Sequence, residues 1–104
     1  MISANSKNNC LVRITDERIK HIISNHPETK NCITWIHDTI ENPDLIIAGD
    51  YGELLAVKLY GKTPVTNDKF LTVVYKETSN LDGFILTAYF SRNFNKKRRL
   101  IWKL

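Results

Sequence analysis

The sequence ITWIHDTIENPDLIIA, residues 33–48, decides the fold because its hydrophobic period changes halfway along. Isoleucines in its first half recur every three to four residues, which predicts a helix from about Cys32 to Glu41. The pair Asn42-Pro43 ends that helix, since the residue before a proline avoids the α conformation. The apolar run over residues 44–48 then predicts a short strand. A helical part of the chain therefore precedes a strand-rich part.

A first helix is expected upstream of this stretch. Thr15 is a suitable N-cap, and the two acidic residues after it favour the positive end of the helix dipole. Three isoleucines then form an apolar stripe, and His26-Pro27 ends the helix. Ahead of Thr15, we expect a short edge strand over residues 10–14 and a flexible arm over residues 1–9.

Beyond the second helix, short runs of apolar and polar residues alternate between turn signals. Strands are predicted over residues 53–60, 69–76, 84–90 and 100–103. Short loops between them favour antiparallel pairing, and the two amphipathic helices are available to cover one face. The predicted fold class is α+β, with two N-terminal helices packed on a four- to five-stranded, mostly antiparallel sheet, in a single domain over residues 10–104.

Composition narrows the class of protein. With 42% hydrophobic and 25% charged residues, the 104-residue chain has the balance of an ordinary globular domain. No apolar run approaches the roughly 20 residues that cross a bilayer, and residues 1–9 lack the apolar region of a signal peptide. We therefore expect a cytoplasmic protein without membrane contact, in which Cys10 and Cys32 are buried thiols rather than a disulfide.

Positive charge is concentrated at the end of the sequence. Residues 91–104 hold six of the 15 basic residues and no acidic one, whereas residues 1–90 hold nine basic and 11 acidic residues. Such asymmetry indicates contact with a polyanion, which is either a nucleic acid or an acidic protein surface. Within this basic tail, Lys96, Lys97, Arg98 and Arg99 are candidates for RNA binding, together with Arg18 on the first helix.

Two common ligand motifs are not supported. The tripeptide Gly61-Lys62-Thr63 is similar to the end of a phosphate-binding loop, but an alanine holds the upstream glycine position and Pro64 follows. The histidines His21, His26 and His37 do not have the spacing of a metal-binding helix. No metal or other cofactor is therefore expected.

The sequence does contain the residue types that metal-independent ribonuclease chemistry needs. Cleavage of RNA without a metal uses the neighbouring 2′-hydroxyl as nucleophile, and it needs a base and donors or cations for the charged transition state. His26 is a candidate base, and His21 is a second candidate. Regular alternation from Phe84 to Phe90 would put Phe84, Leu86, Ala88 and Phe90 on the core face and Ile85, Thr87 and Tyr89 on the other. Arg92 follows that strand, within reach of a phosphate.

Each of these residues also has an ordinary structural explanation. His26 would be a packed histidine at the helix end, and His21 a solvated side chain. Thr87 and Tyr89 would be half-exposed strand residues, and Arg92 a surface charge. The residues alone leave both explanations open.

Several short motifs occur in a recognisable order: Arg18-Ile19, His21-Ile22, Asn25-His26-Pro27-Glu28, Asn42-Pro43-Asp44, Leu86-Thr87-Ala88-Tyr89, and a basic tail with Trp102. In this order and spacing, most of residues 15–104 resembles the phage-associated branch of the barnase–EndoU–colicin–RelE nuclease superfold. The resemblance implies N-terminal helices on a four-stranded antiparallel sheet, and metal-independent RNA cleavage, often in toxin–antitoxin systems. It implies a catalytic site of His26, Thr87, Tyr89 and Arg92.

Three functions remain open from the sequence. The first is a toxin-type, metal-independent endoribonuclease that cleaves RNA by 2′-hydroxyl attack. The second is a non-catalytic RNA- or ribosome-binding domain, and the third is a domain that binds an acidic antitoxin or immunity protein through the basic tail. The sequence is compatible with a monomer or a dimer.

Overall fold

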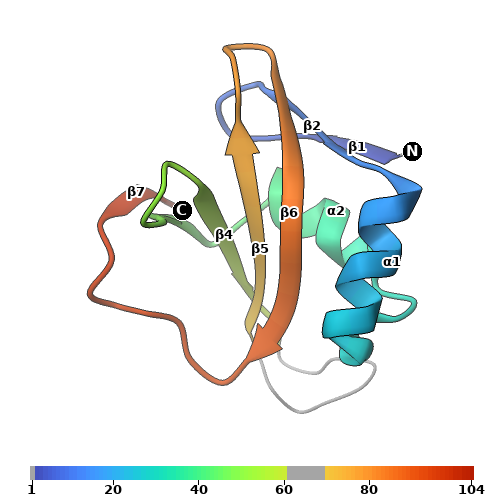
Figure 1. The fold of residues 1–104 in the computed structure, drawn as a ribbon. Coiled ribbons are helices and arrows are strands. Elements are labelled where there is room, and N and C mark those ends of the chain that lie inside the picture. The colour runs from blue at the N-terminus through green and yellow to red at the C-terminus, as the bar shows by residue number, and fades with distance from the viewer. Residues whose placement is uncertain (1, 61–69) are drawn as a thin grey trace.

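A curled, mixed β-sheet forms most of the fold, and two helices pack against one of its faces (Figure 1). The computed structural model describes residues 2–60 and 70–104, and the Gly61-Lys62-Thr63 segment lies outside them. Within the described residues the sheet has seven strands in the order β1-β2-β6-β5-β4-β3-β7. They are β1 (Ile2–Asn5), β2 (Leu11–Ile14), β3 (Leu45–Ala48), β4 (Leu54–Leu59), β5 (Phe70–Glu77), β6 (Asp82–Ser91) and β7 (Leu100–Lys103).

The predicted fold class is wrong in two respects, the place of the helices and the number of strands. The helices do not come first, because the β1–β2 hairpin precedes them. The sheet of the described residues has seven strands instead of four or five. The sheet is mixed: among the described strands β2 pairs in parallel with the start of β6, where Leu11 lies opposite Asp82, and the other pairs are antiparallel. The β2–β6 and β3–β7 pairs join segments far apart in sequence, whereas β1 pairs with its neighbour β2 in a hairpin.

The N-terminal residues that were expected to form a flexible arm form β1 and the turn that joins it to β2. Ala4 lies opposite Val12 in antiparallel register, and both side chains are buried. Ser6 is also buried, and its hydroxyl donates to Glu77 and accepts from the Cys10 N–H. Backbone pairing and this polar anchor order a segment that is too polar to predict as a strand.

The two helices form where the sequence predicts them. Helix α1 (Asp16–Asn25) begins at Thr15, whose hydroxyl accepts the Arg18 N–H at 3.1 Å. It ends at His26, and a short 3₁₀ helix (Pro27–Thr29) follows. Helix α2 (Ile33–Glu41) ends at Asn42, the residue before Pro43. Caps and proline are local signals, so these boundaries could be predicted from sequence.

The main core lies between the helices and the sheet. Its centre comprises Ile22 and Ile36 from the helices and Val73, Tyr75 and Ala88 from the sheet, all buried. Cys10 and Cys32 are buried free thiols, as predicted. No helix of the described residues is long and apolar enough to cross a membrane.

A β-bulge in β6 changes the alternation expected for that strand. Val74 lies opposite Thr87 and Tyr75 opposite Ile85, so Leu86 is an extra residue. On the C-terminal side of the bulge, Ala88 and Phe90 face the main core as predicted. On its N-terminal side the predicted faces are exchanged, because Ile85 is buried in the core whereas Phe84 is 40% exposed.

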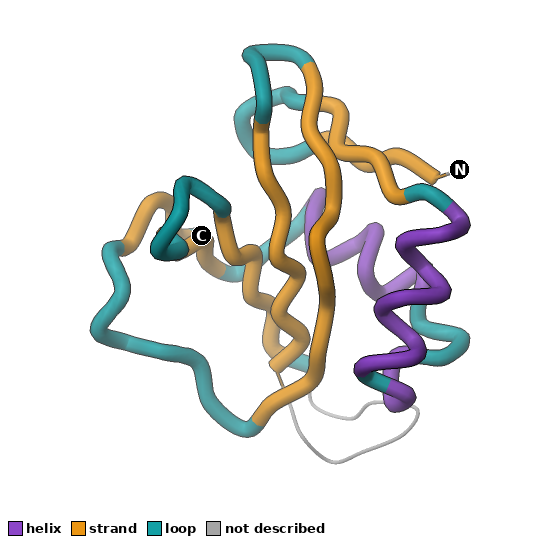
Figure 2. The backbone as a smooth tube through the Cα atoms, viewed as in Figure 1, coloured by secondary structure: helices purple, strands orange, loops and turns teal. Residues whose placement is uncertain are grey.

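The face of the sheet away from the helices carries a second, smaller apolar cluster. Ile47, Leu55 and Val57 are buried there, and Phe94 packs against them. Phe94 belongs to residues 92–99, a wide loop that leads from the end of β6 round to β7 at the far side of the sheet (Figure 2). Residues 92–99, called the basic segment below, are therefore anchored to this second face by the side chain of Phe94.

Candidate functional site

His26 is held at the junction between α1 and the 3₁₀ helix. Its backbone N–H donates to the Ile22 carbonyl at 2.7 Å, and its own carbonyl accepts the Thr29 N–H and hydroxyl. The imidazole is about one-third exposed, and its Nδ1 lies 3.8 Å from Glu28 Oε2. Backbone hydrogen bonds therefore fix the position of His26, and its partly exposed imidazole lies beside the Glu28 carboxylate.

His26 and Tyr89 lie together, although they are far apart in sequence. Their ring centroids are 5.7 Å apart, with the rings inclined at 37°. Below the bulge, β6 lies beside α1 in Figure 1, which brings the end of the helix to this strand. The contact joins two of the four residues of the catalytic site that the resemblance implies.

Thr87 lies on the same sheet face as Tyr89. The two residues are opposite Val74 and Thr72 of β5, respectively, and both are half-buried. Arg92 follows directly after the last residue of β6 and is exposed. Three of the four residues of the implied catalytic site are thus on β6 or next to its end, and His26, at the end of α1, contacts one of them, Tyr89.

The remaining sequence candidates are placed differently. His21 lies on α1 with its side chain 61% exposed, and its Nε2 is 3.8 Å from Glu17 Oε1. Arg18 is exposed on the same helix. No contact joins either side chain to Tyr89 in the part of the chain that the structure describes. A role in a shared site is therefore supported for His26 only.

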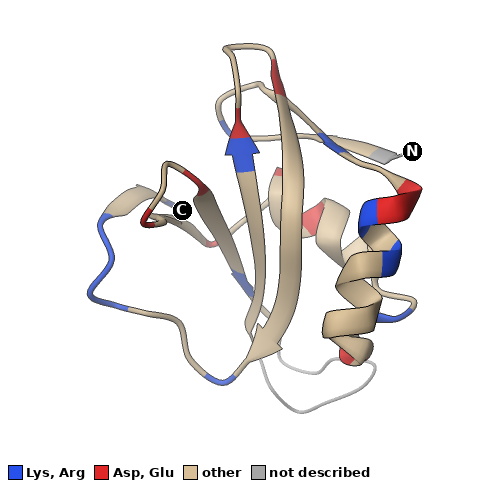
Figure 3. Ribbon diagram, in the orientation of Figure 1, with Lys and Arg blue, Asp and Glu red and all other residues tan. Residues whose placement is uncertain are grey.

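The basic segment after β6 lines an open pocket. Figure 3 shows its Lys and Arg residues following the loop from β6 to β7. The pocket has a volume of about 550 Å³ and lies between this loop and the turn after β3. Its lining residues are Ala48, Gly49, Asp50, Asn95, Lys97, Arg98 and Arg99. Lys96 is exposed on the same loop but is not one of the lining residues.

Arg98, which lines this pocket, is paired with Asp50. Its Nη1 and Nη2 donate to the two Asp50 carboxylate oxygens at 2.8 and 3.2 Å, and Nη1 also donates to the Ala48 carbonyl at 3.4 Å. The hydrogen bond with Asp50 raises the pKa of Arg98, and the charges of Asp50 and Glu53 add to this rise. The sequence offered no signal for the Asp50–Arg98 pair.

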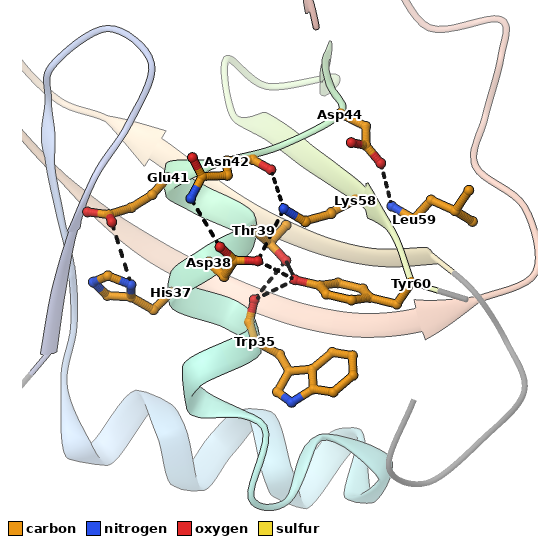
Figure 4. Close-up of polar contacts among 10 residues, drawn as sticks. All are labelled: Trp35, His37, Asp38, Thr39, Glu41, Asn42, Asp44, Lys58, Leu59 and Tyr60. Carbon is orange, nitrogen blue, oxygen red and sulfur yellow. Dashed lines mark hydrogen bonds and ion pairs between the residues drawn. The ribbon is translucent and has the colours of Figure 1, made fainter. Parts of the chain in front are cut away.

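A second polar cluster joins α2 to the end of β4 (Figure 4). The Tyr60 hydroxyl lies 3.1 Å from the Thr39 hydroxyl and 3.3 Å from Asp38 Oδ2. Lys58 Nζ is 3.1 Å from the same carboxylate oxygen. Burial is the main reason why the pKa of Tyr60 is raised to about 12, so the phenol stays protonated as a donor. The Asp38 carboxylate already has several partners within the chain.

Comparisons with known proteins give no further identification. No family model matches the chain, and neither the curated proteins nor the solved structures contain a match. In residues 2–60 and 70–104, no group of three or more His, Cys, Asp or Glu side chains is placed to hold a metal ion.

Proposed function

We propose that this protein is a metal-independent endoribonuclease of the toxin type, acting in the cytoplasm. The observation that carries the proposal is the contact between His26 and Tyr89, a residue of the strand that leads into the basic segment. An imidazole that is about one-third exposed, a phenol and basic side chains are the kinds of group that RNA cleavage by the 2′-hydroxyl requires. None of these side chains is needed to complete the main apolar core.

Each group has a role in the proposed reaction. The 2′-hydroxyl of RNA attacks the adjacent phosphorus, His26 accepts the hydroxyl proton, and the 5′-oxygen leaves and takes a proton from water. Tyr89 and Thr87 donate hydrogen bonds to the phosphate oxygens as charge develops on them. Arg92, next to the end of β6, contributes positive charge to the same phosphate. The products are a 2′,3′-cyclic phosphate and a free 5′-hydroxyl.

The test is cleavage of RNA in the presence of EDTA. We expect the wild type to cleave and His26→Ala to lose at least about a hundredfold in rate, as is typical for a general base. The matched control is His37→Ala, because His37 Nδ1 also lies 3.8 Å from a carboxylate, that of Glu41, but on α2. Intact RNA with the wild type, or equal loss in both variants, would contradict the proposal.

Binding without cleavage is the second candidate function. It is favoured by the pocket that Lys97, Arg98 and Arg99 line, since such a pocket needs no catalytic base to hold RNA. It predicts RNA binding that weakens steeply with salt and is unchanged in His26→Ala. Salt-independent binding would argue against it.

A further inference from the structure

The guanidinium of Arg98 is occupied by an anion supplied by the chain itself. Both of its terminal nitrogens donate to Asp50, one to each carboxylate oxygen, at 2.8 and 3.2 Å. This two-point geometry suits a carboxylate or a phosphate equally well, because both present two oxygens to the planar fork. Asp50 therefore takes the position on Arg98 that a phosphodiester group would take.

The two partners of this ion pair differ in how firmly they are held. Arg98 has a side chain only 27% exposed, and the Ala48 carbonyl accepts from its Nη1. Asp50 is 67% exposed and lies in a turn where Gly52 adopts a φ of 86°. Exposed ion pairs contribute little to stability, so the carboxylate can be displaced at small cost while the guanidinium stays in place.

The surroundings of the pair favour an anionic ligand with several charges. Lys97 and Arg99 line the same pocket, on either side of Arg98 in sequence. Glu53 is the other acidic group that acts on Arg98, and it would remain to oppose binding. The segment that lines the pocket starts at the end of β6, the strand that carries Tyr89.

We propose that Asp50 is an internal competitor at an RNA phosphate site. At rest its carboxylate holds Arg98, and a phosphodiester group of bound RNA displaces it and accepts the same two hydrogen bonds. This inference rests on the RNA-directed function proposed above and adds a site and a means of limiting affinity. RNA is favoured over an acidic protein because the pocket belongs to the segment that follows the His26–Tyr89 contact.

The test measures binding of a 2′-O-methyl RNA oligonucleotide, which lacks the nucleophile for cleavage, by fluorescence anisotropy at low salt. Asp50→Asn should bind about two- to fivefold more tightly than the wild type, the range expected for release of one exposed ion pair. Asp82→Asn is the matched control, because Asp82 forms an exposed ion pair with Arg13 at the other end of β6. It makes the same change in net charge and should leave the affinity unchanged.

A second variant tests whether the gain in affinity from Asp50→Asn depends on Arg98. In an Arg98→Ala background, where binding should be weaker, Asp50→Asn should give no gain. An equal gain in both backgrounds, or an equal gain from Asp82→Asn, would overturn the inference. Polyglutamate bound as tightly as the oligonucleotide, and equally affected by Asp50→Asn, would overturn the choice of RNA.

The outcome for the inference can be separated from the outcome for the proposed function. Cleavage of unmodified RNA by the wild type, with no gain in binding from Asp50→Asn, would refute the competitor role and leave the ribonuclease standing. A wild type that neither cleaves RNA nor binds the oligonucleotide would refute both. Tighter binding by Asp50→Asn without cleavage would support the site and refute the enzyme.

Discussion

Lys58 connects β4 to the end of α2 through polar contacts, and replacing it with methionine should show how much these contacts contribute to the free energy of unfolding. Its Nζ donates to the Asn42 carbonyl at 2.9 Å and lies 3.1 Å from Asp38 Oδ2. The Lys58 side chain is 22% exposed and that of Asp38 is 44% exposed. Methionine keeps an apolar stem about as long as that of lysine but lacks the ammonium group, so both polar contacts are removed.

The expected loss follows from these contacts and their exposure. A hydrogen bond from a charged group is worth about 1.5–3 kcal/mol when buried, and solvent reduces the value of an exposed ion pair to at most about 1 kcal/mol. Because Asp38 is nearly half exposed, we expect Lys58→Met to lower the free energy of unfolding by about 1–2 kcal/mol at pH 7. Urea unfolding followed by circular dichroism measures this difference.

The loss should also depend on pH. Burial alone would raise the pKa of Asp38, but hydrogen bonds from Asn42, Lys58 and Tyr60, with the charge of Lys58, outweigh burial and lower it. A carboxyl with a lowered pKa contributes stability above its unfolded pKa of about 3.9, and that stability is lost as pH falls through the folded pKa. The destabilisation by Lys58→Met should therefore shrink as the pH is lowered toward and below that folded value.

The control is Lys20→Met, at an exposed position on α1 with no ion-pair partner among the described residues. It should change the stability by less than about 0.5 kcal/mol at any pH. A loss for Lys58→Met that is equally large at pH 7 and pH 3, or no larger than that of the control, would refute the reasoning about Asp38.

Three further predictions test the fold. Gly83→Ala should cost about 2 kcal/mol in urea unfolding, because its Cβ would lie 2.5 Å from a β5 carbonyl oxygen; an unchanged midpoint would count against the β5–β6 register. Ala4→Asp at a buried position should lower the free energy of unfolding by about 3 kcal/mol, and Ser3→Asp at an exposed position should lower it by less than about 0.5 kcal/mol. Equal effects would mean that β1 does not pack on the core. Burial raises the pKa of the Cys10 and Cys32 thiols, so a disulfide reagent should modify them slowly until guanidinium unfolds the protein, and rapid native labelling would contradict this.

Local signals predicted the helices and most of the strands. The Thr15 cap and the prolines at positions 27 and 43 act within a few residues, so a sequence contains all the information needed to place them. The N-terminal strand could not be predicted in this way. It is polar, and it is stable because β2 pairs with it and because Ser6 bonds to Glu77, 71 residues away.

Local signals also selected some residues of the candidate site, and tertiary contacts determine the rest. His26 and Tyr89 were selected by residue type and by their places at a helix end and on a strand, and the fold brings them into contact. The Asp50–Arg98 pair spans 48 residues and joins two loops, for which no pattern in the sequence predicts proximity. The segment's position on the second face depends likewise on Phe94, whose packing is a tertiary contact.

The extra residue in β6 has a consequence for how this strand can change in length. Because Leu86 and Thr87 together occupy one step of the ladder, removing one residue there would leave Ile85 and Ala88 facing the core and Tyr89 facing away from it. Removing a residue anywhere between Ala88 and Ser91 would instead turn part of the strand over. Insertions and deletions in related sequences should therefore collect at Leu86–Thr87, and the segment from Ala88 to Arg92 should keep a constant length.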